Sequence, residues 1–263
     1  TRPQAMGNEL SGITGVKMAD IFFSQKDDKG KWSKPEAVLG EVNTEYEDGA
    51  CSFSPDGKTM YFTRCTHDPN YPRYAIIMSS NRSDAAWSKP EEVKISSDTL
   101  STFAYPAVSP DGKWLYFSSD MPGGHGGMDL WKVSLDEHGM GAPENLGPGV
   151  NTYGDDVFPS FRANGEFYFS SDGHPGMGGL DLFQAEQDST GQWTLTNLGY
   201  PMNSAGDDFG MTFEGLHNRG FFSTNRGNGR GWDQLMSFEC PEIVQSIKGW
   251  VYEKDGYELP EAL

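Results

Sequence analysis

A repeating unit of about fifty residues is the feature that most restricts what this chain can fold into. The stretch "LYFSSDMPGGHGGMDLW" begins at Leu115, and the similar stretch "FYFSSDGHPGMGGLDLF" begins at Phe167. Each starts as an apolar strand and continues as a glycine-rich loop that ends in Asp-Leu and an aromatic residue. Similarity at a fixed period is the signature of repeat architectures, in which each unit buries its apolar surface against the next one.

Other segments of the chain follow the same period. Strand–turn–strand segments such as "FSPDGKTMYFTR" and "VSPDGKWLYFSSD" begin at Phe53, Val108, Phe161 and Phe213. In the Ser-Pro-Asp-Gly turn, Pro fixes its own φ and Gly takes the left-handed position. A third strand follows each glycine-rich loop and is expected to open at Asp20, Ala75, Asp129, Asp181 and Asp233. A shorter fourth strand is expected around Trp32, Trp87, Met140 and Trp193.

Four short antiparallel strands per period, without helical periodicity, predict the blades of an all-β β-propeller. The propeller is expected to cover residues 1–242, with repeats near 1–40, 41–95, 96–147, 148–199 and 200–242. The first repeat holds only the outer half of a blade, so its inner strands are expected upstream of Thr1. Five blades are favoured, and six are the alternative. The last blade shows no fourth strand, which an upstream segment is expected to supply. Residues 243–263 are predicted to be a linker and the first strand of a truncated β-sandwich domain.

The charge of the chain bears on its partners. It has 20 Lys and Arg against 38 Asp and Glu, a formal net charge of −18. Such a surface repels phosphate backbones, which argues against a nucleic-acid partner and favours a basic protein or a cation. The sequence has no 18-residue apolar segment, so no membrane insertion is predicted. Its three cysteines, with no close pair, argue against a zinc site and a disulfide framework.

The repeats resemble those of a known family. The stretch "SPDGKWLYFSSDMPGGHGGMDL" from Ser109 and the stretch "NRGNGRGWD" from Asn225 resemble WD40-like repeats of the PD40, TolB type. They are closest to the version found in OmpA-family envelope proteins of Bacteroidetes. The resemblance covers roughly residues 1–240. The tail "IKGWVYEKDGYELPEAL" from Ile247 resembles the start of a carboxypeptidase regulatory-like domain, which follows the propeller in these proteins.

The resemblance implies a periplasmic, outer-membrane-associated location and a non-catalytic role as a protein–protein interaction scaffold. It implies other envelope or secretion-system proteins as partners, as in type IX secretion components. Peptidoglycan would be reached only through an OmpA-like domain that these residues do not include. The alternatives are a propeller enzyme of the glycosidase or lactonase type and a module that binds a metal or a small ligand. A glycosidase needs two carboxylates a fixed distance apart, and no local motif marks such a pair, so no catalytic residue is predicted.

One face of the predicted propeller gathers the candidate site residues, because the links into the inner strands and the glycine-rich loops lie on the same side. Either its acidic pairs form a rim that binds a partner, or each Asp accepts backbone N–H groups and fixes its loop. The outer-strand tryptophans are candidate anchors for a partner. The candidate partner-binding residues are Glu47, Asp48, Asp155, Asp156, Asp207, Asp208, Trp32, Trp87 and Trp193.

The glycine-rich loops with His125 and His174 raise the question of a ligand site. A phosphate loop needs a following helix, and here a strand follows, so phosphate binding is disfavoured. Asp129, Asp181 and Asp233 are expected to cap these turns. A calcium site built from Asp172, Asp181 and backbone carbonyls is the one metal site considered, and no other cofactor is predicted.

Overall fold

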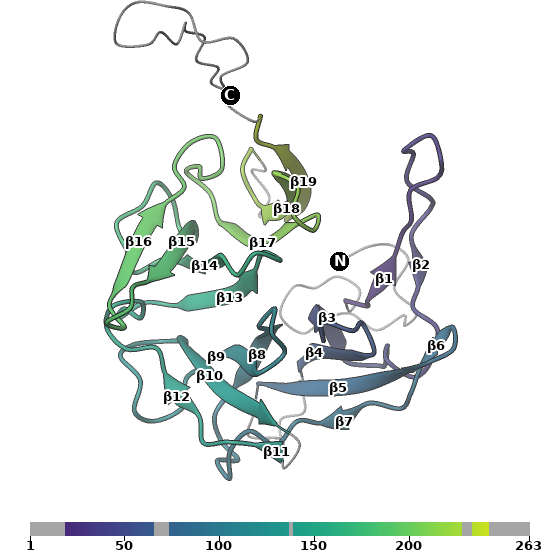
Figure 1. The fold of residues 1–263 in the computed structure, drawn as a ribbon, viewed down its shortest axis with the longest axis horizontal. Coiled ribbons are helices and arrows are strands. Elements are labelled where there is room, and N and C mark those ends of the chain that lie inside the picture. Colours follow the sequence, from purple (N-terminus) through teal and green to yellow (C-terminus); the bar gives the residue numbers. More distant parts are fainter. Residues whose placement is uncertain (1–18, 66–73, 137–138, 228–232, 242–263) are drawn as a thin grey trace, which may run out of the picture.

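The computed structural model describes residues 19–65, 74–136, 139–227 and 233–241, and in these ranges it is entirely β, without a helix. The sheets stand around a common axis as the blades of a propeller (Figure 1). The predicted all-β propeller is therefore confirmed, with four blades formed by the described residues. Nothing in the described ranges forms a helix of the length and apolarity that a membrane crossing requires.

Blades A and B have the same plan, in which the third strand pairs with two short outer strands. Blade A consists of β3 (Glu47–Phe53), β4 (Thr59–Cys65), β5 (Ala75–Ser83), β6 (Ala86–Trp87) and β7 (Glu91–Glu92). Blade B consists of β8 (Phe103–Val108), β9 (Trp114–Ser119), β10 (Asp129–Asp136), β11 (Gly139–Met140) and β12 (Glu144–Asn145).

Blade C has four strands in sequential order, and blade D has three among the described residues. Blade C consists of β13 (Asp156–Phe161), β14 (Phe167–Ser171), β15 (Asp181–Gln187) and β16 (Trp193–Asn197). Blade D consists of β17 (Asp208–Phe213), β18 (Arg219–Thr224) and β19 (Gln234–Glu239). A two-stranded sheet, here called the outer hairpin, consists of β1 (Phe22–Phe23) and β2 (Glu36–Ala37).

The aromatic pairs on the second strands explain why the blades pack. Adjacent residues of a strand point to opposite faces of the sheet. Phe117 accordingly lies in the core between blades A and B, whereas Tyr116 packs into the core between blades B and C. Phe169 and Tyr168 divide in the same way between the blade B–C and blade C–D cores. These aromatic residues pack between blades, as predicted. Full burial of a side chain such as Phe117 stabilises the fold by about 1.5–3 kcal/mol.

The Ser-Pro-Asp-Gly turns have the predicted geometry. Gly57 and Gly112 have φ of 68° and 72°, a region that a β-branched residue adopts only with strain. Asp111 completes the turn, because its carboxylate accepts the Ser109 hydroxyl at 2.6 Å and the Lys113 backbone N–H at 3.1 Å.

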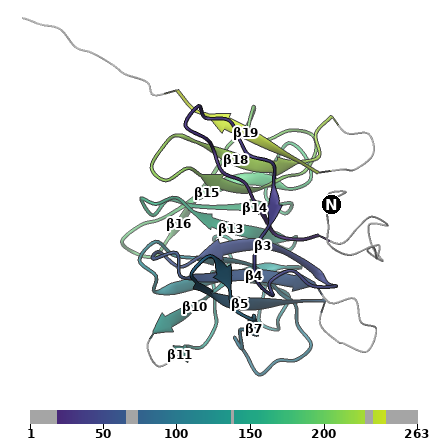
Figure 2. The ribbon, with the colours of Figure 1, turned by 90° about the vertical axis from the view of Figure 1, so that its right-hand side faces the viewer.

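The outer hairpin occupies a fifth position in the ring, between blades D and A. Both views place it there, in dark purple (Figures 1 and 2). On one side Trp32 contacts Phe221 of blade D edge to face, with ring centroids 5.8 Å apart, and Lys26 lies 3.5 Å from Glu214. On the other side Gly40 forms a β-bridge with Trp87 of blade A. The expected inner strands of the first blade, the missing fourth strand of blade D and the β-sandwich tail lie outside the described residues and stay predictions.

Candidate functional site

The four inner strands share a local irregularity that shapes the channel along the propeller axis. Each has a register shift of the β-bulge type against its second strand. The residue inside each shift has positive φ: Ala50 (46°), Tyr105 (54°), Phe158 (53°) and Gly210 (65°). Three of these residues are not glycine. Such strain persists only where the surrounding fold enforces it, and it frequently marks functional positions.

The bulges bring three aromatic rings together along the channel. The rings of Tyr105 and Phe158 have centroids 3.9 Å apart, and those of Phe158 and Phe209 lie 4.8 Å apart. Tyr105 and Phe158 line two separate cavities. We call these the lower chamber, of about 780 Å³, at the end of the Ser-Pro-Asp-Gly turns, and the upper chamber, of about 430 Å³, at the other end. Burial raises the pKa of Tyr105 to about 12, so its hydroxyl stays protonated.

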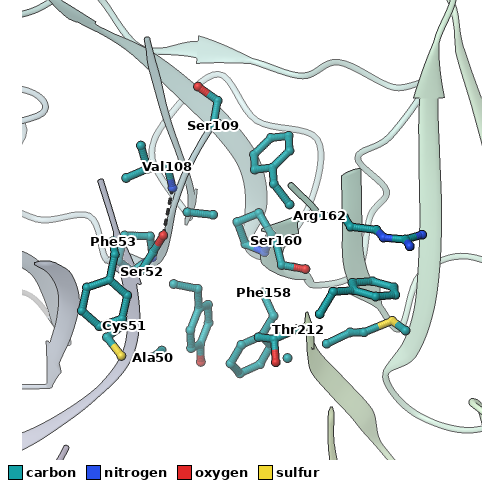
Figure 3. Close-up of a pocket in the computed structure, with 18 of the residues that line it drawn as sticks. Ala50, Cys51, Ser52, Phe53, Val108, Ser109, Phe158, Ser160, Arg162 and Thr212 are labelled. Carbon is teal, nitrogen blue, oxygen red and sulfur yellow. Dashed lines mark hydrogen bonds between the residues drawn. The ribbon is translucent and has the colours of Figure 1, made fainter. Parts of the chain in front are cut away.

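The lower chamber is mainly apolar, with a few hydroxyl groups and one charged side chain, Arg162 (Figure 3). The Ser52 hydroxyl already has a hydrogen-bond partner, because its Oγ accepts the backbone N–H of Val108 at 3.1 Å. Ser160, at the same position of blade C, has a buried Oγ without a hydrogen-bond partner among the described residues, and so does Arg162 at Nε. The other nitrogens of Arg162 bind Glu166, the Leu216 carbonyl and the Asn218 side chain, which fixes blade C to the turn of blade D.

The upper chamber is acidic. Its lining includes Asp155, Asp172 and Asp207 from blades C and D, beside Thr63 and Tyr105. None of the three carboxylates forms a salt bridge within the described ranges, although each accepts a backbone N–H. Three like charges around one opening add their fields, which attracts cationic groups.

The second residue of each acidic pair is the first or second residue of an inner strand and is fully buried. Asp48 and Asp208 are each paired with an arginine, Arg64 at 2.7 Å and Arg226 at 2.6 Å. Asp156 has no arginine beside it in the described part of the chain, and its Oδ1 has no hydrogen-bond partner there. Burial raises the pKa of Asp156, and the Ser171 hydroxyl and the Thr152 N–H and hydroxyl offset this in part.

The other oxygen of each buried carboxylate holds the entry link of its own blade. Asp156 Oδ2 accepts the Thr152 N–H at 2.6 Å, and Asp208 Oδ2 accepts the Ser204 N–H at 2.6 Å. Asp48 Oδ2 does the same for the Thr44 N–H, at 2.9 Å. The loop-fixing interpretation therefore describes these three residues, and since they are buried they offer no contact surface to a partner.

In two of the three pairs the first residue reaches the glycine-rich loop of the preceding blade. Asp155 Oδ1 accepts the Met128 N–H at 2.8 Å, and Asp207 Oδ1 accepts the Leu180 N–H at 3.0 Å. Asp155 is exposed, and Asp207 is half-buried. Glu47 is half-buried at the start of β3. Asp155 and Asp207 thus fix loops and also contribute charge to the upper chamber.

The glycine-rich loops lie directly against the next blade. A Cβ at Gly126 would overlap the backbone of Tyr153, and a Cβ at Gly178 would overlap the backbone around Gly206. Glycine is required here for close approach between blades. Asp129 and Asp181 cap the same loops as predicted, because they accept the N–H groups of His125 and Met177. Asp233 lies just before β19, next to residues outside the described ranges.

The calcium prediction has no further support from the geometry. Asp172 Oδ1 accepts the Asp155 N–H at 2.7 Å, and Asp181 is buried within its own loop. Within the described ranges no three His, Cys, Asp or Glu residues gather as a metal site would require. The cysteines Cys51, Cys65 and Cys240 are free thiols.

The three candidate tryptophans differ in exposure. Trp32 is 47% exposed, at the tip of the outer hairpin. Trp87 and Trp193 are half-buried and pack against inter-blade cores, Trp87 on that of the outer hairpin and blade A, Trp193 on that of blades B and C. Trp32 is thus the most accessible of the candidate anchors.

The sequence did not reveal the two axial chambers. Tyr105 and Phe158 stand at equivalent places in their repeats, each followed by a proline, but only the bulge turns them toward the axis. The one sequence signal for these axial residues was an aromatic residue followed by Pro at the same position of two consecutive repeats. Arg64 and Arg226 could not be matched to their aspartates, because they stand at different repeat positions.

Comparison with known proteins gives a distant structural relationship. No family model and no curated protein matches the sequence. Among solved structures, an α-L-arabinofuranosidase from Lactobacillus brevis aligns over 92% of this chain and 93% of that chain, with TM-score 0.50 and 12% identity. A putative TolB from Agrobacterium tumefaciens aligns over 67% of this chain and 60% of that chain, with TM-score 0.41 and 23% identity. A puromycin-hydrolyzing peptidase from Mycobacterium tuberculosis aligns over 72% and 27%, with TM-score 0.45 and 16% identity.

These similarities concern the fold alone. What they add is that other proteins share the β-propeller architecture that the blades of this chain form. The aligned part of this chain spans between about a quarter and three fifths of the length of each of three such solved proteins. The same propeller hosts unrelated activities, so function has to be argued from the residues of this chain.

Proposed function

We propose that this propeller is a non-catalytic scaffold of the bacterial cell envelope that docks other envelope or secretion-system proteins. On this proposal it belongs to a periplasmic, outer-membrane-associated protein of the OmpA family, similar to the PorE component of the type IX secretion system. Peptidoglycan anchoring would come from a further domain. The repeat motifs quoted above support the placement, and the geometry of the upper chamber supports the mode of binding.

The observation that carries the proposal is the state of the carboxylates in the upper chamber. Asp155, Asp172 and Asp207 each accept a backbone N–H that fixes a loop. Accepting one N–H leaves each carboxylate further acceptor positions for a cationic donor. Three such carboxylates around one opening favour electrostatic recruitment of a basic segment of a partner. Trp32, exposed on the outer hairpin, is an additional anchor on the flank of the ring.

Charge-neutral variants test this directly. The first variant combines Asp155→Asn and Asp172→Asn. Each Asn keeps an oxygen that can accept the backbone N–H bound by the original Asp, so the loops should keep their conformation while two negative charges are lost. The matched control is Asp56→Asn with Asp111→Asn, which removes two charges from the turns at the opposite end of the channel. Partners captured from envelope extract would be identified by mass spectrometry, and their association rates measured with each variant.

We expect the upper-chamber variant to slow association several-fold at 0.1 M salt and the control variant to leave it unchanged. The difference should fade at 1 M salt, where the Debye length falls from about 10 Å to about 3 Å. Equal effects of the two variants would mean that only net charge matters. No effect of either would remove the upper chamber from the proposal and leave Trp32 and the blade flanks as the surfaces to test.

The lower chamber supports a second candidate, a module that binds a small neutral ligand. Its volume of about 780 Å³ is typical of ligand pockets, and Ser160 Oγ and Arg162 Nε are buried polar groups without partners there. A thermal-shift screen of small neutral compounds would test it, with Ser160→Ala expected to abolish the shift of any true ligand. A screen without a Ser160-dependent compound would reject it.

A further inference from the structure

The outer hairpin has the features of the outer half of a blade. In the entry links of blades C and D an asparagine binds the third strand of the preceding blade, Asn151 to Leu130 and Asn203 to Leu182, through paired bonds of 2.8–3.0 Å. Asn43 binds Ile21 in the same way, at 2.7 and 2.9 Å. The segment around Ile21 therefore holds the third-strand position of a blade that precedes blade A.

Within the described ranges, no strand pairs with the inner edge of this half blade. The third strands β10 and β15 pair on that edge with β9 and β14, whereas β1 pairs only with β2 among the described residues. We call the space between blades D and A, on the axial side of β1, the open slot. If a strand pair normally fills it, the neighbouring blades should carry interface residues that are left exposed here.

The wall on blade D has such residues. Ile77, Leu130 and Leu182 occupy equivalent third-strand positions, each paired with the residue that follows the aromatic pair of the second strand. They face the next blade and are 1%, 0% and 1% exposed. Leu235, paired with Ser223, holds this position in blade D and is 61% exposed.

The wall on blade A shows the same contrast. The inner-strand residue that follows the positive-φ residue is Pro106, Pro159 or Met211 in blades B, C and D, and each is buried. Cys51 is its equivalent in blade A and is exposed. Phe53, two residues further on, is 47% exposed. Both walls thus have the composition of a blade interface without the partner surface.

We propose that the open slot is an acceptor for two antiparallel strands of this polypeptide, supplied by a segment upstream of Thr1, where the inner strands of the first blade are expected. The order of the chain points to this source, because in every described blade the strands run from the axis outward and the chain enters β1 from Ala19. The second of the two strands should carry an aromatic pair followed by Ser or Thr. In blade A this hydroxyl belongs to Thr63, whose Oγ1 accepts the N–H of Tyr105 in the next blade at 2.8 Å. The corresponding hydroxyl of the added strand would accept the backbone N–H of Ala50 in the same way.

Filling the slot also completes the lower chamber. Cys51, Phe53 and Ser223 line that chamber and flank the slot as well. The added strands therefore close the side wall of the axial channel, and any ligand of the lower chamber should bind more weakly while the slot is empty.

The experiment uses Cys51 as the reporter, because this residue is exposed here whereas its equivalents in blades B, C and D are buried. A copy of residues 155–180, the inner strands and loop of blade C, replaces residues 1–19 in front of Asp20. The matched control carries the same copy with Phe167→Asp and Phe169→Asp within it. Maleimide labelling of Cys51 is followed in both proteins and in the unaltered chain, with the exposed Cys240 as internal reference.

The copy should slow labelling of Cys51 by about tenfold or more and raise the melting temperature by on the order of 5 °C, with Cys240 and the control protein unchanged. A free peptide of residues 155–172 is also added to the unaltered chain, where it should protect Cys51 from labelling in a saturable manner. This second format keeps the test valid if the protein that carries the copy does not fold. Absence of protection in both formats overturns the proposal. Protection of Cys51 in the unaltered chain that grows with protein concentration also overturns it, because a second copy would then be the occupant.

Discussion

Replacing Asp208 with Asn probes the buried ion pairs that hold the entry links. Asp208 is fully buried, and its Oδ1 lies 2.6 Å from Nη2 of Arg226. Its Oδ2 accepts the Ser204 N–H at 2.6 Å and the Ser204 hydroxyl at 2.8 Å. The Asn oxygen can keep the bonds to Ser204, so the substitution removes chiefly the charge that faces Arg226.

The size of the effect follows from what Arg226 retains. Removing one partner of a buried ion pair typically costs about 3–5 kcal/mol. The Arg226 side chain is 21% exposed and still donates to the carbonyls of Pro201 and Met202, which places the loss at or just below the low end of that range, at about 2–3 kcal/mol. For a chain of this size that corresponds to a decrease in melting temperature of roughly 5–10 °C. Urea unfolding followed by circular dichroism measures the free energy of unfolding directly.

Asp156→Asn is the matched comparison at the same repeat position. Asp156 has no arginine beside it in the described ranges, and burial raises its pKa, so the folded state disfavours its charge. The Asn variant should stay within about 1 kcal/mol of the original chain or exceed it in stability.

The pH dependence of this comparison has a defined sign. Because the pKa of Asp156 is raised on folding, the folded state binds more protons, and stability from this group falls as pH rises from the unfolded pKa of about 3.9 through the folded value. The advantage of Asn should therefore grow from acid to neutral pH and vanish below about pH 3.9.

Two results would refute this reasoning. Equal losses for the two Asn variants would mean that the arginine contributes nothing. Failure of Arg226→Met to recover stability in the Asp208→Asn background would mean that the loss does not come from an unpaired buried charge.

Other predictions address the turns, the loops and the fold. Gly57→Val or Gly112→Val should cost on the order of 1–3 kcal/mol in urea unfolding, since each forces a β-branched residue to positive φ; a neutral result would require another turn geometry. Gly178→Ala should lower the melting temperature because its Cβ would overlap the backbone around Gly206, whereas Gly49→Ala, with no atom nearby, should be tolerated; equal effects would refute the close-approach argument. Far-ultraviolet circular dichroism should show strand and almost no helix, and a sizeable helical signal would contradict the propeller.

The repeat pattern alone was sufficient to predict the blades, the turn glycines and the aromatic packing between blades. Tyr116 and Phe117 illustrate why: two adjacent apolar residues in a strand must bury opposite faces, and only a neighbouring sheet on each side can do so. Gly112 is equally local, since its φ is set by the four-residue turn in which it stands. Features that depend on neighbours along the chain are readable from the sequence.

Only the tertiary structure decided what the acidic pairs do. Asp48, Asp156 and Asp208 read alike in the sequence, yet two are neutralised by arginines and the third has no arginine beside it in the part of the chain that the structure describes. The difference depends on which side chains reach the buried carboxylates once the strands have paired. The same holds for Tyr105 and Phe158, which a bulge turns into the axis, and for Leu235, exposed where its equivalents are buried. Docking of blades some fifty residues apart sets these contacts, and no local pattern records it.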